Sequence, residues 1–188
     1  GPAQWDRDLT DDFLRYLDKR DAGRPFFSLL FYDAPHSFDL PAGYPLHFQP
    51  SIEDANYLRL GRSSDREPWF NRYLNSVRFV DALVGEVLTG IEARGLLGNS
   101  VILITGDHGQ EFNDNDRNYW GHSSNFTRYQ TGVPFILYSP QTQAGSVAHR
   151  TTHFDVMPTL LRDFLGCTNP FSTHSVGRPL LEAGGRDT

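Results

Sequence analysis

The chain has 188 residues, of which 38% are hydrophobic and 13% are aromatic, and this is enough apolar material for the core of one compact domain. Its 17 basic and 23 acidic residues give a net charge of -6, which argues against a surface that tracks nucleic-acid phosphates. The single cysteine, Cys167, excludes an intrachain disulfide and a cysteine-based metal cage.

The first third of the chain is predicted to hold a short helix, a buried strand and a long loop. Thr10 is followed by two acidic residues and reads as the N-cap of a helix that runs to about Arg20. Residues 25–32 form a continuous apolar and aromatic run, which is typical of a strand buried on both faces. Residues 33–66 are rich in Pro, Gly, Ser and Asp and predict a long surface loop, a kind of segment that often carries function.

A long amphipathic helix is predicted over residues 68–97. Its apolar residues recur in steps of three and four, which places them on one helix face. They are Val77, Val80, Val84, Val87 and Ile91. Gly95 lies near the predicted end, where a left-handed cap residue is expected.

Two further strands and a last helix complete the predicted order. The strands cover residues 101–105 and 133–138. The helix covers residues 155–165, with Asp155 as its cap and Gly166 as its stop. Alternating strands and helices of this kind predict an α/β fold built on a layered sheet.

An acid and an imidazole stand side by side in the turn Gly106-Asp107-His108-Gly109, directly after the strand 101–105. Ligands of open α/β sheets bind at the carboxyl ends of strands. Carboxylate and imidazole are good ligands for Zn²⁺ or Mn²⁺, and the carboxylate also suits Mg²⁺. The alternative is that Asp107 only closes the turn and His108 packs against a helix.

Two more histidines occupy comparable places. His36 lies just beyond the predicted aromatic strand, and His122 lies in the loop before the strand 133–138. If both converge with His108 on one crevice, neutral imidazoles can ligate a metal and protonated ones can hold an anionic oxygen. The alternative for each is an ordinary surface histidine, and no role is assigned to His153. Motifs of serine hydrolases, NTPases and dinucleotide-binding proteins are absent from the sequence.

Three segments, taken in order, resemble the C-terminal half of sulfatase-like members of the alkaline phosphatase superfamily. They are "NSVRFVDALVGEVLTGIEARGLLGNSVILITGDHGQEF", "WGHSSNFTRYQTGVPFILYSP" and "HFDVMPTLL". The resemblance implies a three-layer αβα sandwich, present here as a C-terminal fragment. It also implies that Asp107 and His108 ligate a divalent metal (Mn, Zn or Mg) and that His36 and His122 are catalytic residues that bind the substrate phosphate.

Within that group, "GDHGQEFND" and "WGHSSNFTRYQT" are most similar to the periplasmic domains of the YejM/PbgA inner-membrane proteins of Gram-negative bacteria. This similarity implies a place on the periplasmic side of the inner membrane and a part in lipopolysaccharide and lipid homeostasis. The implied partners are lipids, either lipid A and lipopolysaccharide or cardiolipin, and a regulatory protein. No stretch here approaches the roughly 18 to 20 apolar residues of a membrane span, so an anchor would lie outside this sequence.

The resemblance leaves two functions open. Gly1-Pro2 reads as the remnant of a cleaved tag, so residues 3–188 are taken as the C-terminal part of the sulfatase-like domain. In the family, the nucleophile and the first acidic metal ligand come from an upstream half that this sequence lacks. We expect a lipid-sensing or regulatory platform. The alternative is a metal-dependent phosphatase, phosphodiesterase or phospho-headgroup transferase whose Thr or Ser nucleophile comes from the absent half.

Overall fold

The computed structural model describes residues 1–182, and these divide into two units. The first unit consists of residues 1–98 and 103–137, and it contains every candidate residue except His153. The second consists of residues 99–102 and the chain from Tyr138 onward. Within residues 1–182, no helix is long and apolar enough to cross a membrane.

Helix α1 (Pro2–Lys19) starts much earlier than predicted. Pro2 stands at its first position, where a missing backbone N–H costs nothing. The prediction that Thr10 is an N-cap is wrong, because Thr10 is buried in the middle of the helix and its Oγ1 donates to the Asp6 carbonyl at 2.9 Å. The buried residues of α1 recur in alternating steps of three and four, which is the period of a helix. The predicted start at Thr10 left out the first part of this row. Its residues are Ala3, Asp6, Thr10, Phe13 and Leu17.

Helix α3 (Glu67–Ala93) packs against α1 and confirms the predicted long helix, although it ends earlier. The buried apolar stripe shares Val87 and Ile91 with the predicted face, but its N-terminal part follows a row spaced by four residues, while Val77, Val80 and Val84 are only half-buried. The stripe consists of Phe79, Leu83, Val87 and Ile91. Gly95 adopts φ +67, and Leu96 N–H donates to the Ile91 carbonyl at 3.1 Å, so the predicted left-handed helix end is confirmed.

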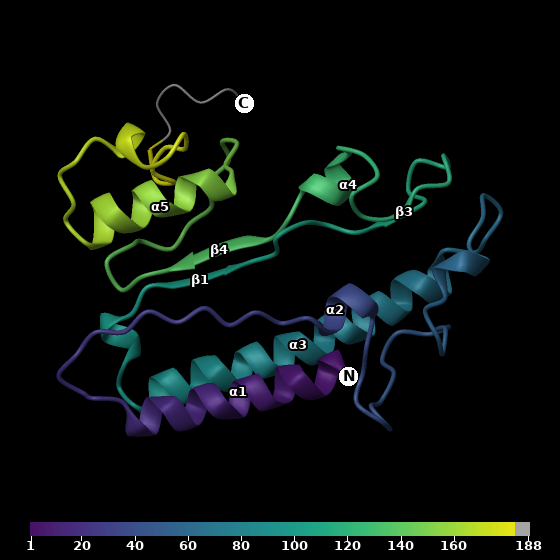
Figure 1. The fold of residues 1–188 in the computed structure, drawn as a ribbon, viewed down its shortest axis with the longest axis horizontal. Coiled ribbons are helices and arrows are strands. Elements are labelled where there is room, and N and C mark those ends of the chain that lie inside the picture. The colour runs from purple at the N-terminus through teal and green to yellow at the C-terminus, as the bar shows by residue number, and fades with distance from the viewer. Residues whose placement is uncertain (183–188) are drawn as a thin grey trace. The chain divides into compact units, whose positions relative to one another are not determined.

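The prediction of a strand at residues 25–32 is wrong. The segment has no strand, and Figure 1 draws it as a thin tube without an arrow. Phe26 packs on α1, with its ring centroid 5.6 Å from that of Tyr16. Phe27 and Leu29, by contrast, are 84% and 78% exposed. An apolar run marks a strand only where neighbouring strands pair with it. The full three-layer sandwich is accordingly not evident in this chain.

In the described part of the chain, residues 1–182, four short strands form two small sheets. The predicted strands are confirmed in shortened form as β1 (Ile102–Thr105) and β4 (Phe135–Tyr138), which are neighbours in one sheet. The other sheet pairs β2 (Glu111–Phe112) with β3 (Trp120–Gly121) in antiparallel register, so that Glu111 lies opposite Gly121. A 3₁₀ turn, η2 (Leu97–Asn99), precedes β1.

The predicted long loop holds the short helix α2 (Ala34–Ser37) and the 3₁₀ turn η1 (Tyr57–Arg59). Ala34 belongs to a buried cluster with Ala3, Phe79 and Leu83. Phe38, at the other end of α2, belongs to a second cluster whose buried members are Phe38, Trp69 and Phe112. Because each end of α2 packs into a different cluster, this helix is held in place although it has only one turn (Figure 1).

Buried Asp6 fixes the start of α2. Its Oδ1 accepts the N–H of Asp33 at 2.9 Å and its Oδ2 accepts the N–H of Ala34 at 2.8 Å. Burial raises the pKa of Asp6, and these two donated hydrogen bonds oppose that rise. A side chain of α1 thereby caps the helix that carries His36.

The second unit contains the predicted last helix. The 3₁₀ turn η3 (His153–Asp155) leads into α5 (Val156–Thr159), which continues as the π-helical turn η4 (Leu160–Phe164). Asp155 acts in a capping box one turn earlier than predicted: Thr152 is the N-cap of η3, and Asp155 accepts its N–H at 2.7 Å, whereas Asp155 makes no side-chain capping hydrogen bond to α5. Gly166, with φ +66, ends the helical stretch as predicted. Two short elements complete the structure: η5 (Phe171–Thr173) in this unit and α4 (Arg128–Thr131) in the first.

We predict that Asp6→Ala lowers the free energy of unfolding by about 2–3 kcal/mol, because it leaves two buried backbone N–H groups without an acceptor. Urea unfolding followed by circular dichroism measures this. Asp8→Ala is the matched control, since Asp8 lies on the same helix and loses only an exposed hydrogen bond from Gln4. Equal stability of the two variants would contradict the capping role of Asp6.

Candidate functional site

Three imidazole rings from distant parts of the chain meet in the first unit. His36 comes from α2, His108 from the turn after β1, and His122 from the residue after β3. The His108 and His122 rings stack with centroids 4.0 Å apart, and the His36 and His122 centroids are 5.2 Å apart. The structure thus brings together the three histidines that the sequence placed at strand ends, while their roles stay predictions. His153 lies in the second unit.

Asp107 closes the turn that it shares with His108, as one of the alternatives drawn from the sequence has it, and its part in metal binding stays a prediction. Asp107 Oδ1 accepts the backbone N–H of His108 at 3.0 Å, so the acid does close the turn. Its other oxygen, Oδ2, lies 3.8 Å from His108 Nε2. His108 Nδ1 lies 2.8 Å from the Gly109 carbonyl oxygen, which can only accept, and this places the ring proton on Nδ1. Nε2 therefore keeps a free lone pair next to a carboxylate oxygen.

Gly109 is required by the close approach of another segment. Its N–H donates to the Gln130 carbonyl at 2.8 Å. A Cβ at this position would stand 2.2 Å from the Tyr129 carbonyl oxygen, and real Cβ atoms do not come this close to a neighbouring atom. The glycine of the motif therefore lets the turn pack directly on α4.

Asp107 and His108 carry the kinds of donor atom that a divalent cation takes. A carboxylate oxygen and an imidazole with its other nitrogen engaged by a carbonyl are the donors that Zn²⁺ and Mn²⁺ take in proteins. Within residues 1–182, no group of three or more His, Cys, Asp or Glu side chains is arranged to hold a metal. A closed coordination shell therefore needs ligands beyond this pair.

His122 is the most constrained of the three rings. Its Nδ1 lies 3.1 Å from Gln110 Oε1, and Gln110 Nε2 donates to the Tyr57 hydroxyl at 3.0 Å. Burial lowers the pKa of His122, and the nearby His108 and His36 lower it further, while Asp107 acts in the opposite direction. The ring is therefore neutral down to a lower pH than an ordinary histidine.

Glu111 is a buried carboxylate that the sequence did not single out. It is fully buried and accepts four side-chain hydrogen bonds. The donors are Asn125 at 2.7 Å, Gln130 at 2.7 Å, Asn115 at 2.9 Å and Thr127 at 3.3 Å. Burial by itself raises the pKa of this carboxyl, but the four hydrogen bonds outweigh it and hold the pKa below its ordinary value of 4.5.

This network shapes the loop that carries His122. Gln130 joins it from α4 and also accepts the N–H of Ser124 at 3.1 Å. Asn125, the acceptor residue of an Asn-Phe-Thr sequon, uses its amide nitrogen to bind Glu111. Little in the sequence indicates this network, because one acidic residue among Asn and Gln residues in a polar stretch is typical of a solvent-exposed loop.

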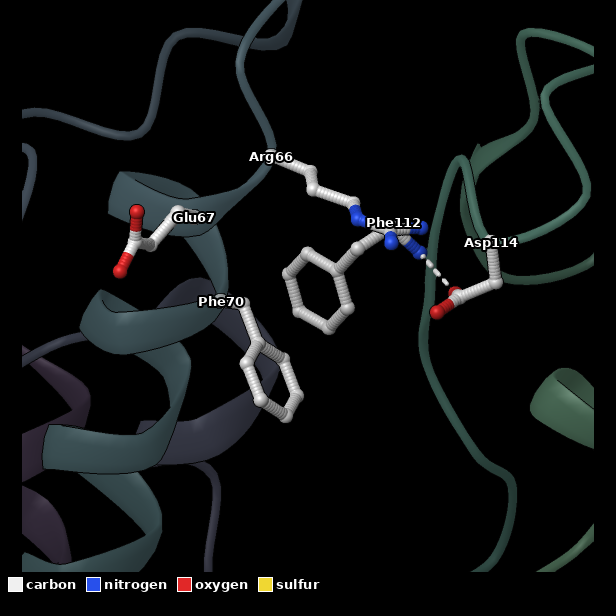
Figure 2. Close-up of a pocket in the computed structure, with 5 residues that line it drawn as sticks. All are labelled: Arg66, Glu67, Phe70, Phe112 and Asp114. Atoms are coloured by element: carbon white, nitrogen blue, oxygen red, sulfur yellow. Dashed lines mark hydrogen bonds between the residues drawn. The ribbon is translucent and has the colours of Figure 1, made fainter.

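A cavity of about 310 Å³ opens in the same unit, and none of the three histidines lines it. Figure 2 shows its five lining residues, which are Arg66, Glu67, Phe70, Phe112 and Asp114. The Phe70 and Phe112 rings meet edge to face at 5.3 Å. The dashed line in Figure 2 is the hydrogen bond that Phe112 N–H donates to Asp114 at 2.8 Å, so this carboxylate is engaged with the backbone.

Comparison with known proteins identifies the family to which the chain belongs. The sequence model of the Sulfatase family matches residues 2–166. The chain belongs to the sulfatase family. Its mixed α/β structure is therefore part of a sulfatase domain.

The relatives of this sulfatase-family chain include two sulfatases and an inner membrane protein. It is 27% identical to an arylsulfatase of Clostridium perfringens, over 96% of this chain and 42% of the relative. It is 26% identical to the inner membrane protein YejM of Salmonella typhimurium, over 63% of this chain and 19% of the relative. It is 27% identical to mouse iduronate 2-sulfatase, over 72% of this chain and 30% of the relative. The chain thus spans less than half the length of each.

We predict that Glu111→Gln lowers the free energy of unfolding by about 2–3 kcal/mol at neutral pH, because amide donors of the network then face an amide instead of a carboxylate. Since the folded pKa of Glu111 is lowered, its contribution is complete above pH 4.5 and is lost as pH falls through the folded pKa. Chemical denaturation at several pH values should therefore show the two proteins converging in acid.

The matched control is Glu92→Gln, which changes an exposed carboxylate on α3. A Glu111→Gln protein that is as stable as this control at neutral pH would show that the network does not hold the loop.

Proposed function

We propose that this chain is part of a sulfatase-family domain in which His36 and His122 bind the oxyanion of a sulfate or phosphate ester beside His108. In this proposal Asp107 and His108 supply two ligands of a divalent cation beside that oxyanion. The observation that carries the proposal is the approach of the three rings, with centroid distances of 4.0 Å and 5.2 Å.

The electrostatics of the cluster favour an anion. Imidazoles this close repel one another when protonated, and this repulsion contributes to the lowered pKa of His122. A bound oxyanion offsets the repulsion and accepts charge-assisted hydrogen bonds from the protonated rings. The cluster therefore binds an anion more tightly as pH falls toward the range in which its rings are protonated.

A cation at the Asp107-His108 turn would act as a Lewis acid and polarise an oxygen of the bound ester. His108 Nε2 is suited to hold it, because the Gly109 carbonyl keeps the ring proton on Nδ1. Asp107 Oδ2 adds negative charge on the same side, while Oδ1 is held by the turn. His36 and His122 remain to bind the ester oxygens.

A second candidate is a regulatory platform at the bacterial inner membrane. The similarity to YejM, an inner membrane protein, favours it. In this version the bound group is the phosphate of lipid A, lipopolysaccharide or cardiolipin on the periplasmic side, and a regulatory protein responds to its binding. Both candidates use the same histidines, and they differ in whether the bound ester is cleaved.

We predict that phosphate binds the chain at about pH 6 and that His122→Ala or His36→Ala weakens it by about tenfold, because one charge-assisted hydrogen bond is lost. Titration followed by NMR of the imidazole resonances measures the affinity, and sulfate is tested in parallel. His47→Ala is the control, since the His47 ring lies away from the cluster, against Tyr44. Equal phosphate affinity in all variants would overturn the oxyanion site.

A further inference from the structure

A chain of two side-chain hydrogen bonds ends on His122. The Tyr57 hydroxyl accepts from Gln110 Nε2 at 3.0 Å, and Gln110 Oε1 faces His122 Nδ1 at 3.1 Å. Because an amide oxygen can only accept, His122 Nδ1 carries the proton in this arrangement. The lone pair of the neutral ring is then on Nε2.

We propose that Gln110 and Tyr57 are positioning residues that hold His122 with a proton on Nδ1, so that Nε2 is the nitrogen that meets a bound ligand and donates to an oxyanion when it carries a proton as well. The consequence for ligand binding rests on the function proposed above. The tautomer itself does not, because it follows from the hydrogen bonds within the chain.

The backbone places the two ends of this relay opposite each other. The antiparallel register of β2 and β3 sets Glu111 against Gly121. Gln110 directly precedes Glu111, and His122 directly follows Gly121. Gln110 and His122 therefore lie opposite each other just beyond the last residue pair of the two strands. The relay is therefore a product of the same strand pair that buries Glu111.

Tyr57 is held by rings that belong to the core. Its ring meets Trp69 at 5.4 Å in a T-shaped contact and lies 6.0 Å from Phe38. Both of these partners are buried. The Tyr57 hydroxyl is thus held in place, and it accepts from Gln110 Nε2, so that the amide oxygen of Gln110 faces His122.

His108 shows the same arrangement. Its Nδ1 lies 2.8 Å from the Gly109 carbonyl oxygen, an acceptor from this chain. Gln110 therefore supplies for His122 what a backbone carbonyl supplies for His108.

The test is long-range ¹H–¹⁵N NMR of the full chain with ¹⁵N-labelled histidine, at a pH where the rings are neutral, because this spectrum distinguishes the two imidazole tautomers. We expect wild-type His122 to be the Nδ1–H form. Gln110→Leu should give mixed tautomers, and Gln110→Glu should restore the Nδ1–H form because a carboxylate only accepts. Tyr57→Phe should give a partial loss. Gln4→Leu, on the exposed side of α1, is the control and should change nothing.

Two results would overturn the proposal. One is wild-type His122 in the Nε2–H form, with Gln110 turned over and Tyr57 donating to it. The other is an Nδ1–H form that persists in Gln110→Leu. Backbone amide spectra of each variant separate these results from misfolding.

Phosphate titration of the same samples keeps the two proposals distinguishable. We expect Gln110→Leu to weaken phosphate binding by about tenfold and Gln110→Glu to recover part of it, as for other residues that orient a ligand-binding histidine. If wild type shows the Nδ1–H form but binds no phosphate, the oxyanion site fails while the relay stands. If phosphate binds and the tautomer is Nε2–H, the relay fails.

Discussion

The burial of the Glu111 carboxylate is the constraint on which the histidine site depends. An ionised group removed from water costs several kcal/mol unless hydrogen bonds replace its hydration. Here four side chains do so, and they come from the loop and short helix that follow β2. Because the carboxylate satisfies its requirement only when that loop is folded back, Glu111 links β2, β3 and α4 into one piece.

His122 and Gln110 are neighbours of this strand pair along the chain, because Gln110 directly precedes β2 and His122 directly follows β3. The strand pair sets them opposite each other, and Gln130 of the network also receives the Gly109 N–H from the Asp-His turn. Asp6 performs a comparable task for His36, since it caps α2 from a different helix. The three imidazoles are thus positioned by buried acids and backbone contacts outside the cluster.

Sequence periodicity anticipated the elements whose burial is local. The helix α3, the strands β1 and β4 and the last helix were all predicted, because their apolar spacing and stop signals lie within the segment. The same reasoning failed at Thr10, where a local cap signal competed with a longer buried stripe, and at residues 25–32, where an apolar run has no strand pairing with it. Glu111, Gln110 and Tyr57 could not be found from sequence, because their roles depend on partners between 4 and 53 residues away.

We propose that Asp107 and His108 share a cation beside an oxyanion held by His36 and His122. The sharpest test is anomalous diffraction from crystals of the protein grown with manganese and phosphate. We expect a manganese peak within coordinating distance of Asp107 Oδ2 and His108 Nε2, and phosphate oxygens against Nε2 of His36 or His122. Manganese bound at other carboxylates, with phosphate absent from the histidines, would contradict it.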